Sequence, residues 1–319
     1  MADTFLLVTT IKNEGPNILE WVAYHKLIGF DRIQIYQNDS SDETQKHLRT
    51  LERIGAIEYF PNPSRKRQWQ NKAYRRASQS ESYRDSTWCM ALDGDEFLHV
   101  KVGDGSVADL VEACGSPDEI LVNWRFFGNA GALELSDELV TARYCQTEKD
   151  DEIASIQRGY KALFRTASYR RPGIHRAKVP LVEAPVIANG SGQRLAAGEP
   201  KSWRTVDPEC RKLAQVNHYA VRDASSFLLK SDRGSASHPD RDVALRYWNL
   251  NNFNNVEDTS LRGKKEKIWG NMKELDAQSR GRLMFLRENS LRLWRERLEQ
   301  LLEDPAYAAL YRELADSRQ

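Results

Sequence analysis

Three carboxylates stand close together near the middle of the chain. Residues 88–92 form an apolar run that is followed by Asp93, Gly94, Asp95 and Glu96. In an extended chain, side chains two residues apart point to the same side, and a glycine between them permits a tight bend and the close approach of a ligand. Mg²⁺ and Mn²⁺ prefer oxygen ligands, usually one or two carboxylates together with phosphate oxygens. We therefore predict that Asp93 and Asp95 bind a divalent cation together with a diphosphate; the alternative is a solvated acidic turn.

The elements that must position these acids alternate between strand and helix. Apolar and β-branched runs predict strands at residues 5–11, 32–37, 56–60 and 87–92, with helices at about 15–29, 38–55 and 68–83 between them. Ser40 with Glu43, and Ser106 with Asp109, have the spacing of helix capping boxes. This order predicts an α/β fold with a doubly wound, mainly parallel sheet.

Ligands of such sheets bind beyond the carboxyl ends of the strands. The first, second and fourth predicted strands end at residues 12–14, 38–39 and 93–95, and all of these residues are polar or charged except Gly94. We therefore expect these three segments to meet on one rim of the sheet.

The second half of the chain is less regular. Residues 119–131 predict one further strand and its loop, and residues 139–220 predict shorter strands and loops, with a surface loop at 185–208 that is rich in Gly, Pro and Ser. From about residue 222 the chain is predicted to be helical, with an apolar stripe of Leu291, Trp294, Leu298, Leu301 and Leu302. We expect this C-terminal region to pack on the sheet; a dimer contact or an anionic membrane surface is the alternative.

Composition narrows the class of protein. The 319 residues include 47 Lys and Arg and 46 Asp and Glu, for a net charge of +1, which gives no support for a nucleic-acid binder. No signal peptide and no apolar stretch long enough for a transmembrane helix is recognisable. The four cysteines are far apart and include no CxxC pair, which favours reduced, structural thiols in a cytoplasmic protein. Peripheral contact with the inner face of the membrane stays open.

Several segments resemble a known family. "TTIKNEGPNILEWVAYHKLIGFDRIQIYQNDSSDET", "MALDGDEFL", "NWRFFGNAG" and "NHYAVRDASSFLLKSDRG" are similar to bacterial glycosyltransferases of the family 2 and family 92 type, which have the GT-A fold. The resemblance implies a GT-A domain at residues 1–235, with a nucleotide-binding half at about 1–100 and an acceptor half at about 101–235. Residues 236–319 would be a helical C-terminal region packed on it.

The resemblance also implies a set of donor-site residues. Asp93, Asp95 and His218 would bind Mn²⁺ or Mg²⁺, although a lone His in an apolar strand is also an ordinary core residue. Lys230 and Arg233 lie one helical turn apart and could neutralise phosphate; a solvated helix face is their alternative. The nucleoside-diphosphate sugar would contact Asp93 as well, and further residues that match the family's donor site are Thr9, Lys12, Asn13, Glu14, Asp39, Gln70, Lys72 and Tyr74.

Aromatic side chains indicate where the sugar or the acceptor would bind. Trp124 and Phe127 could stack on sugar rings, although core packing is the alternative for both. Asn123 could bind hydroxyl groups, and His175 is a further candidate on the acceptor side.

The family resemblance implies transfer of the sugar with inversion to a hydroxyl of a glycan or glycoconjugate. A carboxylate should act as general base, and Glu96, Asp137 and Glu138 are candidates among which the sequence does not decide. Three other functions stay open at this point: a phosphatase of the haloacid dehalogenase type, a nucleotidyltransferase, and a non-catalytic carbohydrate-binding or scaffold protein.

Overall fold

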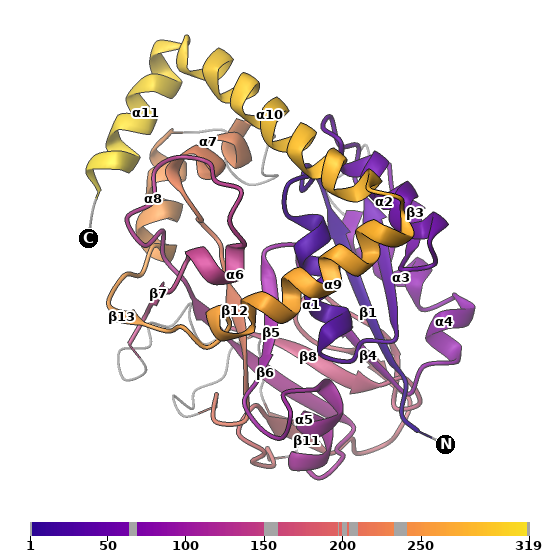
Figure 1. Cartoon of the computed structure of the whole chain (residues 1–319). Coiled ribbons are helices and arrows are strands. Elements are labelled where there is room, and N and C mark those ends of the chain that lie inside the picture. The colour runs from indigo at the N-terminus through magenta and orange to yellow at the C-terminus, as the bar shows by residue number, and fades with distance from the viewer. Residues whose placement is uncertain are drawn as a thin grey trace.

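A computed structural model gives the structure of the chain (Figure 1). It describes residues 2–63, 69–149, 159–196, 198–199, 203, 210–232 and 241–317.

One large sheet organises the described part of the chain. Its strands lie in the order β3-β2-β1-β4-β8-β6-β12-β5, and β11 pairs with β6. The pairs β1–β2, β2–β3, β1–β4, β6–β11 and β6–β12 are parallel, whereas β8 pairs antiparallel with β4 and β6, and β5 pairs antiparallel with β12. Two short pairs, β9–β10 and β7–β13, lie outside the sheet. The strands are β1 (Phe5–Ile11), β2 (Arg32–Gln37), β3 (Glu58–Pro61), β4 (Trp88–Ala91), β5 (Glu96–Val100), β6 (Glu119–Phe126), β7 (Gln146–Thr147), β8 (Tyr160–Arg165), β9 (Tyr169–Arg171), β10 (Lys178–Pro180), β11 (Ile187–Asn189), β12 (Ala214–His218) and β13 (Val256–Glu257).

Helices cover both faces of this sheet. The helices are α1 (Ile18–Leu27), α2 (Thr44–Arg53), α3 (Trp69–Ala77), α4 (Glu81–Arg84), α5 (Val107–Ala113), α6 (Val140–Arg143), α7 (Ala224–Asp232), α8 (Arg241–Asn251), α9 (Lys265–Gln278), α10 (Arg282–Leu302) and α11 (Pro305–Asp316), with a 3-10 turn η2 (Arg262–Lys264). The doubly wound, mainly parallel α/β fold with a helical C-terminal extension is therefore confirmed.

Strand β1 shows why the sheet is covered on both sides. Because successive side chains of a strand point to opposite faces, Phe5 and Leu7 enter the core that contains Trp21 of α1. Leu6 and Val8 enter a second core with Tyr74 of α3. Every residue of β1 is buried, as the continuous apolar run predicted.

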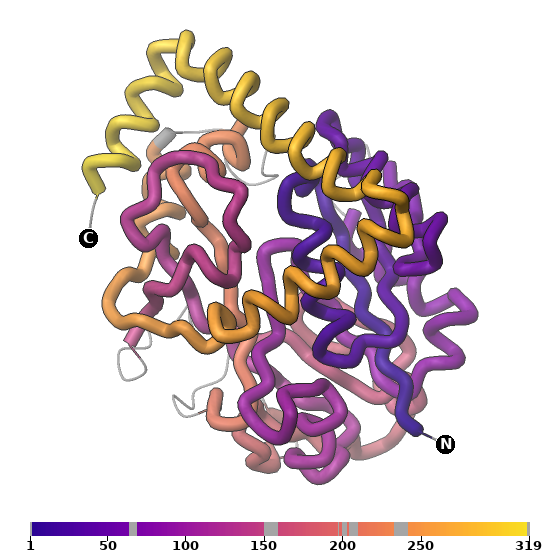
Figure 2. Tube along the Cα trace, viewed as in Figure 1, coloured from indigo at the N-terminus to yellow at the C-terminus, as the bar shows by residue number. Residues whose placement is uncertain are grey.

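The C-terminal helices pack on the rest of the chain, as expected. Figure 2 shows the orange and yellow segment running along one side of the molecule, and α9 contacts α1, α10 contacts α2 and α7, and α11 contacts α7 and α8. Within the predicted stripe, Trp294 and Leu301 are buried in a core with residues of α7 and α8, and Leu298 and Leu302 pack against it. The predicted boundary at residue 235 lies outside the described residues, so the division into domains stays a prediction.

One capping prediction is wrong and the other is confirmed. Helix α2 begins only at Thr44, and its N-cap residue Glu43 makes no capping bond with its side chain. Ser40 Oγ instead accepts the Asn13 N–H at 2.9 Å, and Asp42 Oδ1 accepts the Thr44 N–H at 2.9 Å. The capping box of Ser106 and Asp109 is present at α5.

Two smaller expectations have mixed outcomes. The predicted surface loop at 185–208 includes strand β11, whose three residues are buried against β6, so the loop prediction is wrong there. The four cysteines are buried and form no disulfide, as expected. None of the helices in the described ranges has the length and apolar character needed to cross a membrane.

Candidate active site

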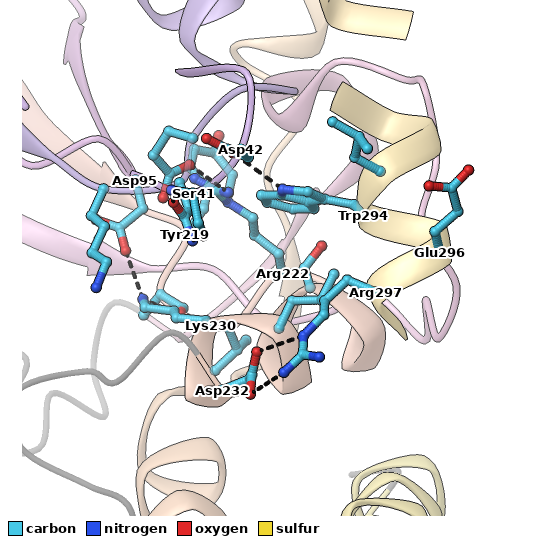
Figure 3. A pocket seen from close by; sticks show the side chains of 18 of the residues that line it. Ser41, Asp42, Asp95, Tyr219, Arg222, Lys230, Asp232, Trp294, Glu296 and Arg297 are labelled. Carbon is cyan, nitrogen blue, oxygen red and sulfur yellow. Dashed lines mark hydrogen bonds and ion pairs between the residues drawn. The ribbon is translucent and has the colours of Figure 1, made fainter. Parts of the chain in front are cut away.

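The polar strand ends line one cavity, as predicted. Its volume is about 620 Å³, and its walls come from the loops after β1 and β2, from Asp95, from residues 219–222, from α7 and from α10 (Figure 3). Six of the predicted donor-site residues line it: Lys12, Asn13, Glu14, Asp39, Asp95 and Lys230.

The loops after β1 and β2 are held together by direct hydrogen bonds. Asn13 and Asp39 have φ angles of 51° and 42°, a left-handed conformation that Asn and Asp tolerate better than most residues. Asn13 Oδ1 accepts the Ser41 N–H at 2.8 Å, in addition to the bond from the Asn13 N–H to Ser40. The two loops therefore form one fixed wall of the cavity.

The protein's own lysines separate the clustered carboxylates. Lys161 of β8 is fully buried, and its Nζ lies 2.8 Å from Asp93 Oδ2 and 3.1 Å from Glu96 Oε2. Glu96 Oε2 also accepts the Asp93 N–H at 2.8 Å, and Gln70 Nε2 donates to Asp93 Oδ1 at 2.9 Å. Burial raises the pKa of Glu96 to about 8 although Lys161 opposes this shift. The half-buried Asp93 and the buried Glu96 thus belong to one hydrogen-bonded cluster around a buried ammonium group.

Asp95 points the other way, into the cavity. Its Oδ2 pairs with Lys230 Nζ at 2.8 Å, and Lys230 also donates to the Ala220 carbonyl at 2.9 Å. Burial acts to raise the pKa of Asp95, but the positive charges of Lys230 and Arg222 outweigh it and hold this pKa far below its usual value. Asp95 is therefore an anion in a cationic surrounding.

Two of the three predicted metal ligands face each other. Asp95 Oδ1 and His218 Nε2 are 3.7 Å apart, less than the sum of two metal–ligand bonds of about 2.1 Å each. Burial lowers the pKa of His218 to about 4, so its imidazole is neutral, as a ligand must be. Both oxygens of Asp93 are bonded elsewhere, to Lys161 and Gln70.

The chemistry of this donor pair fits a divalent ion held by Asp95 and His218, with its other positions left to phosphate oxygens. Among the described residues, no group of three or more His, Cys, Asp or Glu side chains could hold a metal ion. Asp93 as a third ligand stays a prediction.

Arg222 ties the rim together. Its Nη1 lies 3.0 Å from Glu14 Oε2, and its Nη2 donates to the Gly94 carbonyl at 3.4 Å. Its own φ angle is 55°, a conformation that costs on the order of 1 kcal/mol for a non-glycine residue. Arg222 therefore lines the cavity together with Asp95, and its backbone is in a strained conformation.

The predicted acceptor residues form an aromatic cluster beside the acids. The ring centroid of Trp124 lies 5.3 Å from that of His175 and 5.2 Å from that of His218. Lys161 Nζ lies 5.9 Å from the Trp124 ring, which links the cluster to Asp93. Phe127 is buried and packs against Tyr219 at 4.8 Å, in the core.

The remaining predicted residues lie elsewhere. Lys72 Nζ donates to the Pro63 carbonyl at 3.3 Å and does not line the cavity. Asp137 and Glu138 are exposed in the loop before α6. Arg233 lies outside the described residues. Thr9, Tyr74 and Asn123 are buried within β1, α3 and β6.

Three parts of the site were not predicted from the sequence: Lys161, Arg222 and the wall formed by α10. The signal for Lys161 was present: a lysine within the apolar run "YKALF" requires a buried acidic partner. Arg222 and α10 carry no such signal, because their approach to the rim depends on tertiary packing.

Comparison with known proteins identifies the family of this chain. The sequence model of glycosyltransferase family 92 matches residues 12–175, which is about half of the chain. The chain belongs to glycosyltransferase family 92. It is 28% identical over 163 residues to a family 92 protein of Oryza sativa subsp. japonica, covering 49% of this chain and 27% of that protein. A family 92 protein of Ricinus communis is 28% identical over 144 residues, covering 43% and 25%.

A solved structure with some likeness is the crystal structure of S. aureus TarS 1–349 in complex with UDP, with a TM-score of 0.31 and 12% identity over 51% of this chain and 47% of that chain. The matches to the two curated relatives span about a quarter of the length of those proteins.

The mainly parallel α/β sheet agrees with the fold that the resemblance to this family implied. The family match includes the loops after β1 and β2 and the acid cluster. It ends before His218, Lys230 and the C-terminal helices. Membership in this family weighs against the phosphatase and nucleotidyltransferase alternatives.

Proposed function

We propose that this chain is an inverting glycosyltransferase that moves a sugar from a nucleoside-diphosphate sugar to a hydroxyl of a glycan-type acceptor. The observation that carries the proposal is the rim cavity in which Asp95 lies beside Lys230, His218 and Arg222. A diphosphate needs such a concentration of donors and positive charge.

The transfer would follow a single displacement. The acceptor oxygen attacks the anomeric carbon as the bond from that carbon to the diphosphate oxygen breaks, and the bonding electrons leave with the diphosphate. Lys230 and Arg222 are placed to stabilise the charge that develops on this leaving group. An ion held by Asp95 and His218 would add Lewis-acid stabilisation of the same charge.

The acceptor proton must pass to a base. Glu96 is fully buried against Lys161, and Asp137 and Glu138 do not line the cavity. We therefore propose the carboxylates of the cavity wall as further candidates for the base, to be tested beside these three.

The aromatic cluster is the proposed position of the transferred sugar. Trp124 lies between His218, on the metal side, and His175. Aromatic rings pack against the apolar faces of sugars. A sugar here would have its anomeric carbon toward Asp95 and the diphosphate.

We further propose a cytoplasmic location with peripheral contact at the inner face of the membrane. The four cysteines are buried and form no disulfide, which supports a reducing compartment. Binding to vesicles with anionic lipids would test the membrane contact.

Release of nucleoside diphosphate from a panel of nucleotide sugars, with Mn²⁺, Mg²⁺ or EDTA, tests the activity. We expect turnover of one donor class and a loss of at least roughly 100-fold in kcat for Asp95→Asn and Lys230→Met, as for other charge-stabilising groups. Asp85→Asn is the matched control, since Asp85 makes an exposed pair with Arg32 far from the cavity. Full activity of Asp95→Asn would contradict the proposed site.

A further inference from the structure

Helix α10 is docked directly on the loop that follows β1. A Cβ placed on Gly15 would lie 2.6 Å from Ser290 Oγ of α10, so the glycine permits this close approach. Ser290 Oγ also lies 3.4 Å from His47 Nε2 of α2, and Asn289 Nδ2 donates to Glu43 at 3.0 Å. The middle of α10 is therefore fixed against the same loops that carry Lys12 and Asp39.

The next turn of α10 brings Trp294 to the wall of the cavity. Its Nε1 donates to Asp42 Oδ2 at 3.3 Å, and Asp42 Oδ2 also accepts the Gly15 N–H at 3.2 Å. The indole is 8% exposed, and its buried part packs in the core with Phe227 of α7. Trp294 thus forms part of the cavity wall, and only a small part of its ring is exposed there.

A second contact joins α10 to the helix that carries Lys230. Arg297 makes two hydrogen bonds with Asp232 at the end of α7, from Nε at 3.0 Å and from Nη2 at 2.9 Å (Figure 3). Lys230 lies two residues before Asp232 on the same helix. Helix α10 therefore positions α7 as well as forming a wall.

The two sides of the cavity differ in chemistry. Figure 3 shows Asp95 and Lys230 on one side, Trp294 on the other, and Arg222 between them. A nucleoside diphosphate has the same division, with a charged diphosphate at one end and a flat aromatic base at the other. The diphosphate fits the side of Lys230 and Arg222, and the base fits the side of Trp294, where Asp42 and Glu296 also line the cavity.

We propose that α10 supplies the nucleoside-binding wall of the donor site, with Trp294 packed against the base and Asp42 and Asp39 facing the nucleoside. The diphosphate then lies between Arg222 and Lys230. This inference rests on the proposed function, and it assigns a binding role to a helix outside the segment that matches the family.

Two probes separate recognition of the nucleoside from recognition of the phosphates. Titration calorimetry of the full chain with uridine, guanosine and thymidine diphosphates is compared with titration of inorganic pyrophosphate. Trp294→Ala should weaken binding of the preferred nucleoside diphosphate by roughly 10- to 100-fold, as loss of base–aromatic contact does elsewhere. It should leave pyrophosphate binding unchanged, whereas Lys230→Met should weaken both.

Leu298→Ala is the matched control, because Leu298 packs against the same core on α10 but does not line the cavity. Its affinities should equal those of the wild type. If Trp294→Ala does not fold, Trp294→Leu takes its place, because leucine retains part of the apolar volume. The expected result is the same: weaker binding of the nucleoside diphosphate and unchanged binding of pyrophosphate.

Two results would overturn the inference while the proposed function stands: unchanged nucleoside diphosphate binding in the Trp294 variants, or an equal loss of nucleoside diphosphate and pyrophosphate binding. A wild-type chain that binds none of the nucleoside diphosphates would instead overturn the proposed function, and the inference with it.

Discussion

Replacing Lys161 tests the interpretation of the acid cluster. Lys161→Met removes the ammonium that lies 2.8 Å from Asp93 and 3.1 Å from Glu96, and methionine fills a similar volume. Glu96 is fully buried, so its carboxyl group then loses the cation that lies 3.1 Å away in the wild type. We expect the variant to be less stable than the wild type.

The magnitude follows from the burial of the pair. Removing one partner of a buried ion pair costs about 3–5 kcal/mol, because the other charge stays buried and uncompensated. Glu96 can reduce this cost by taking up a proton, since burial already raises its pKa. The folded state then binds a proton that the unfolded state releases above about pH 4.5, so stability falls as pH rises, by up to about 1.4 kcal/mol per pH unit. Because the wild-type pKa is about 8 and loss of Lys161 raises it further, the loss should be larger at pH 9 than at pH 7.

Urea unfolding of the wild type, Lys161→Met, Glu96→Gln and the double variant at both pH values measures this loss. The Gln side chain keeps an oxygen that can accept the Asp93 N–H, so the double variant should recover most of the stability that Lys161→Met loses. A Lys161→Met variant that loses less than about 1 kcal/mol at pH 9, below the range for buried pairs, would contradict this prediction. So would a double variant less stable than either single variant.

Three further predictions concern other parts of the structure. Burial lowers the pKa of His25 to about 3 and of His47 to about 4, so the folded state binds fewer protons than the unfolded state below pH 6.5. The stability contributed by each histidine should be fully present above pH 6.5 and fall by about 2–3 kcal/mol on going to pH 4.5. A urea-unfolding free energy that stays constant over this pH range would contradict this prediction. Gly15→Ala should destabilise the chain by about 1–3 kcal/mol through overpacking against Ser290, and Ser290→Ala should relieve part of this loss in the double variant. Thermal unfolding of the wild type, the two single variants and the double variant gives the coupling free energy between the two positions. Strictly additive effects would count against a direct contact. His218→Asn should abolish any extra thermal stabilisation that Mn²⁺ adds to a nucleoside diphosphate complex, while the nucleotide alone still stabilises the chain; an undiminished Mn²⁺ effect would remove His218 from the ligand set.

The sheet and its rim could be predicted because they depend on local patterns. Strand β1 has the predicted bounds of residues 5–11, since a continuous apolar run is typical of a strand buried on both faces. Parallel strands then place Lys12, Asp39 and Asp95 together without further information.

The parts that could not be predicted depend on contacts between distant segments. Ser40 matches a capping box by spacing, but its hydroxyl bonds to Asn13, 27 residues away. The partners of Asp93 and Asp95 are Lys161 and Lys230, 68 and 135 residues further along the chain. The acids alone suggest a metal ion as their counter-charge. In the fold, a lysine pairs with each of Asp93 and Asp95, and Asp95 with His218 is the pair that could hold a metal ion.

A crystal structure of the chain with its nucleoside-diphosphate sugar tests the central claim most directly. We expect the diphosphate to lie between Lys230 and Arg222, the base to pack against Trp294, and the sugar to lie toward Trp124. A donor bound elsewhere, or a rim cavity with Asp95 still paired to Lys230 and no diphosphate beside them, would contradict it.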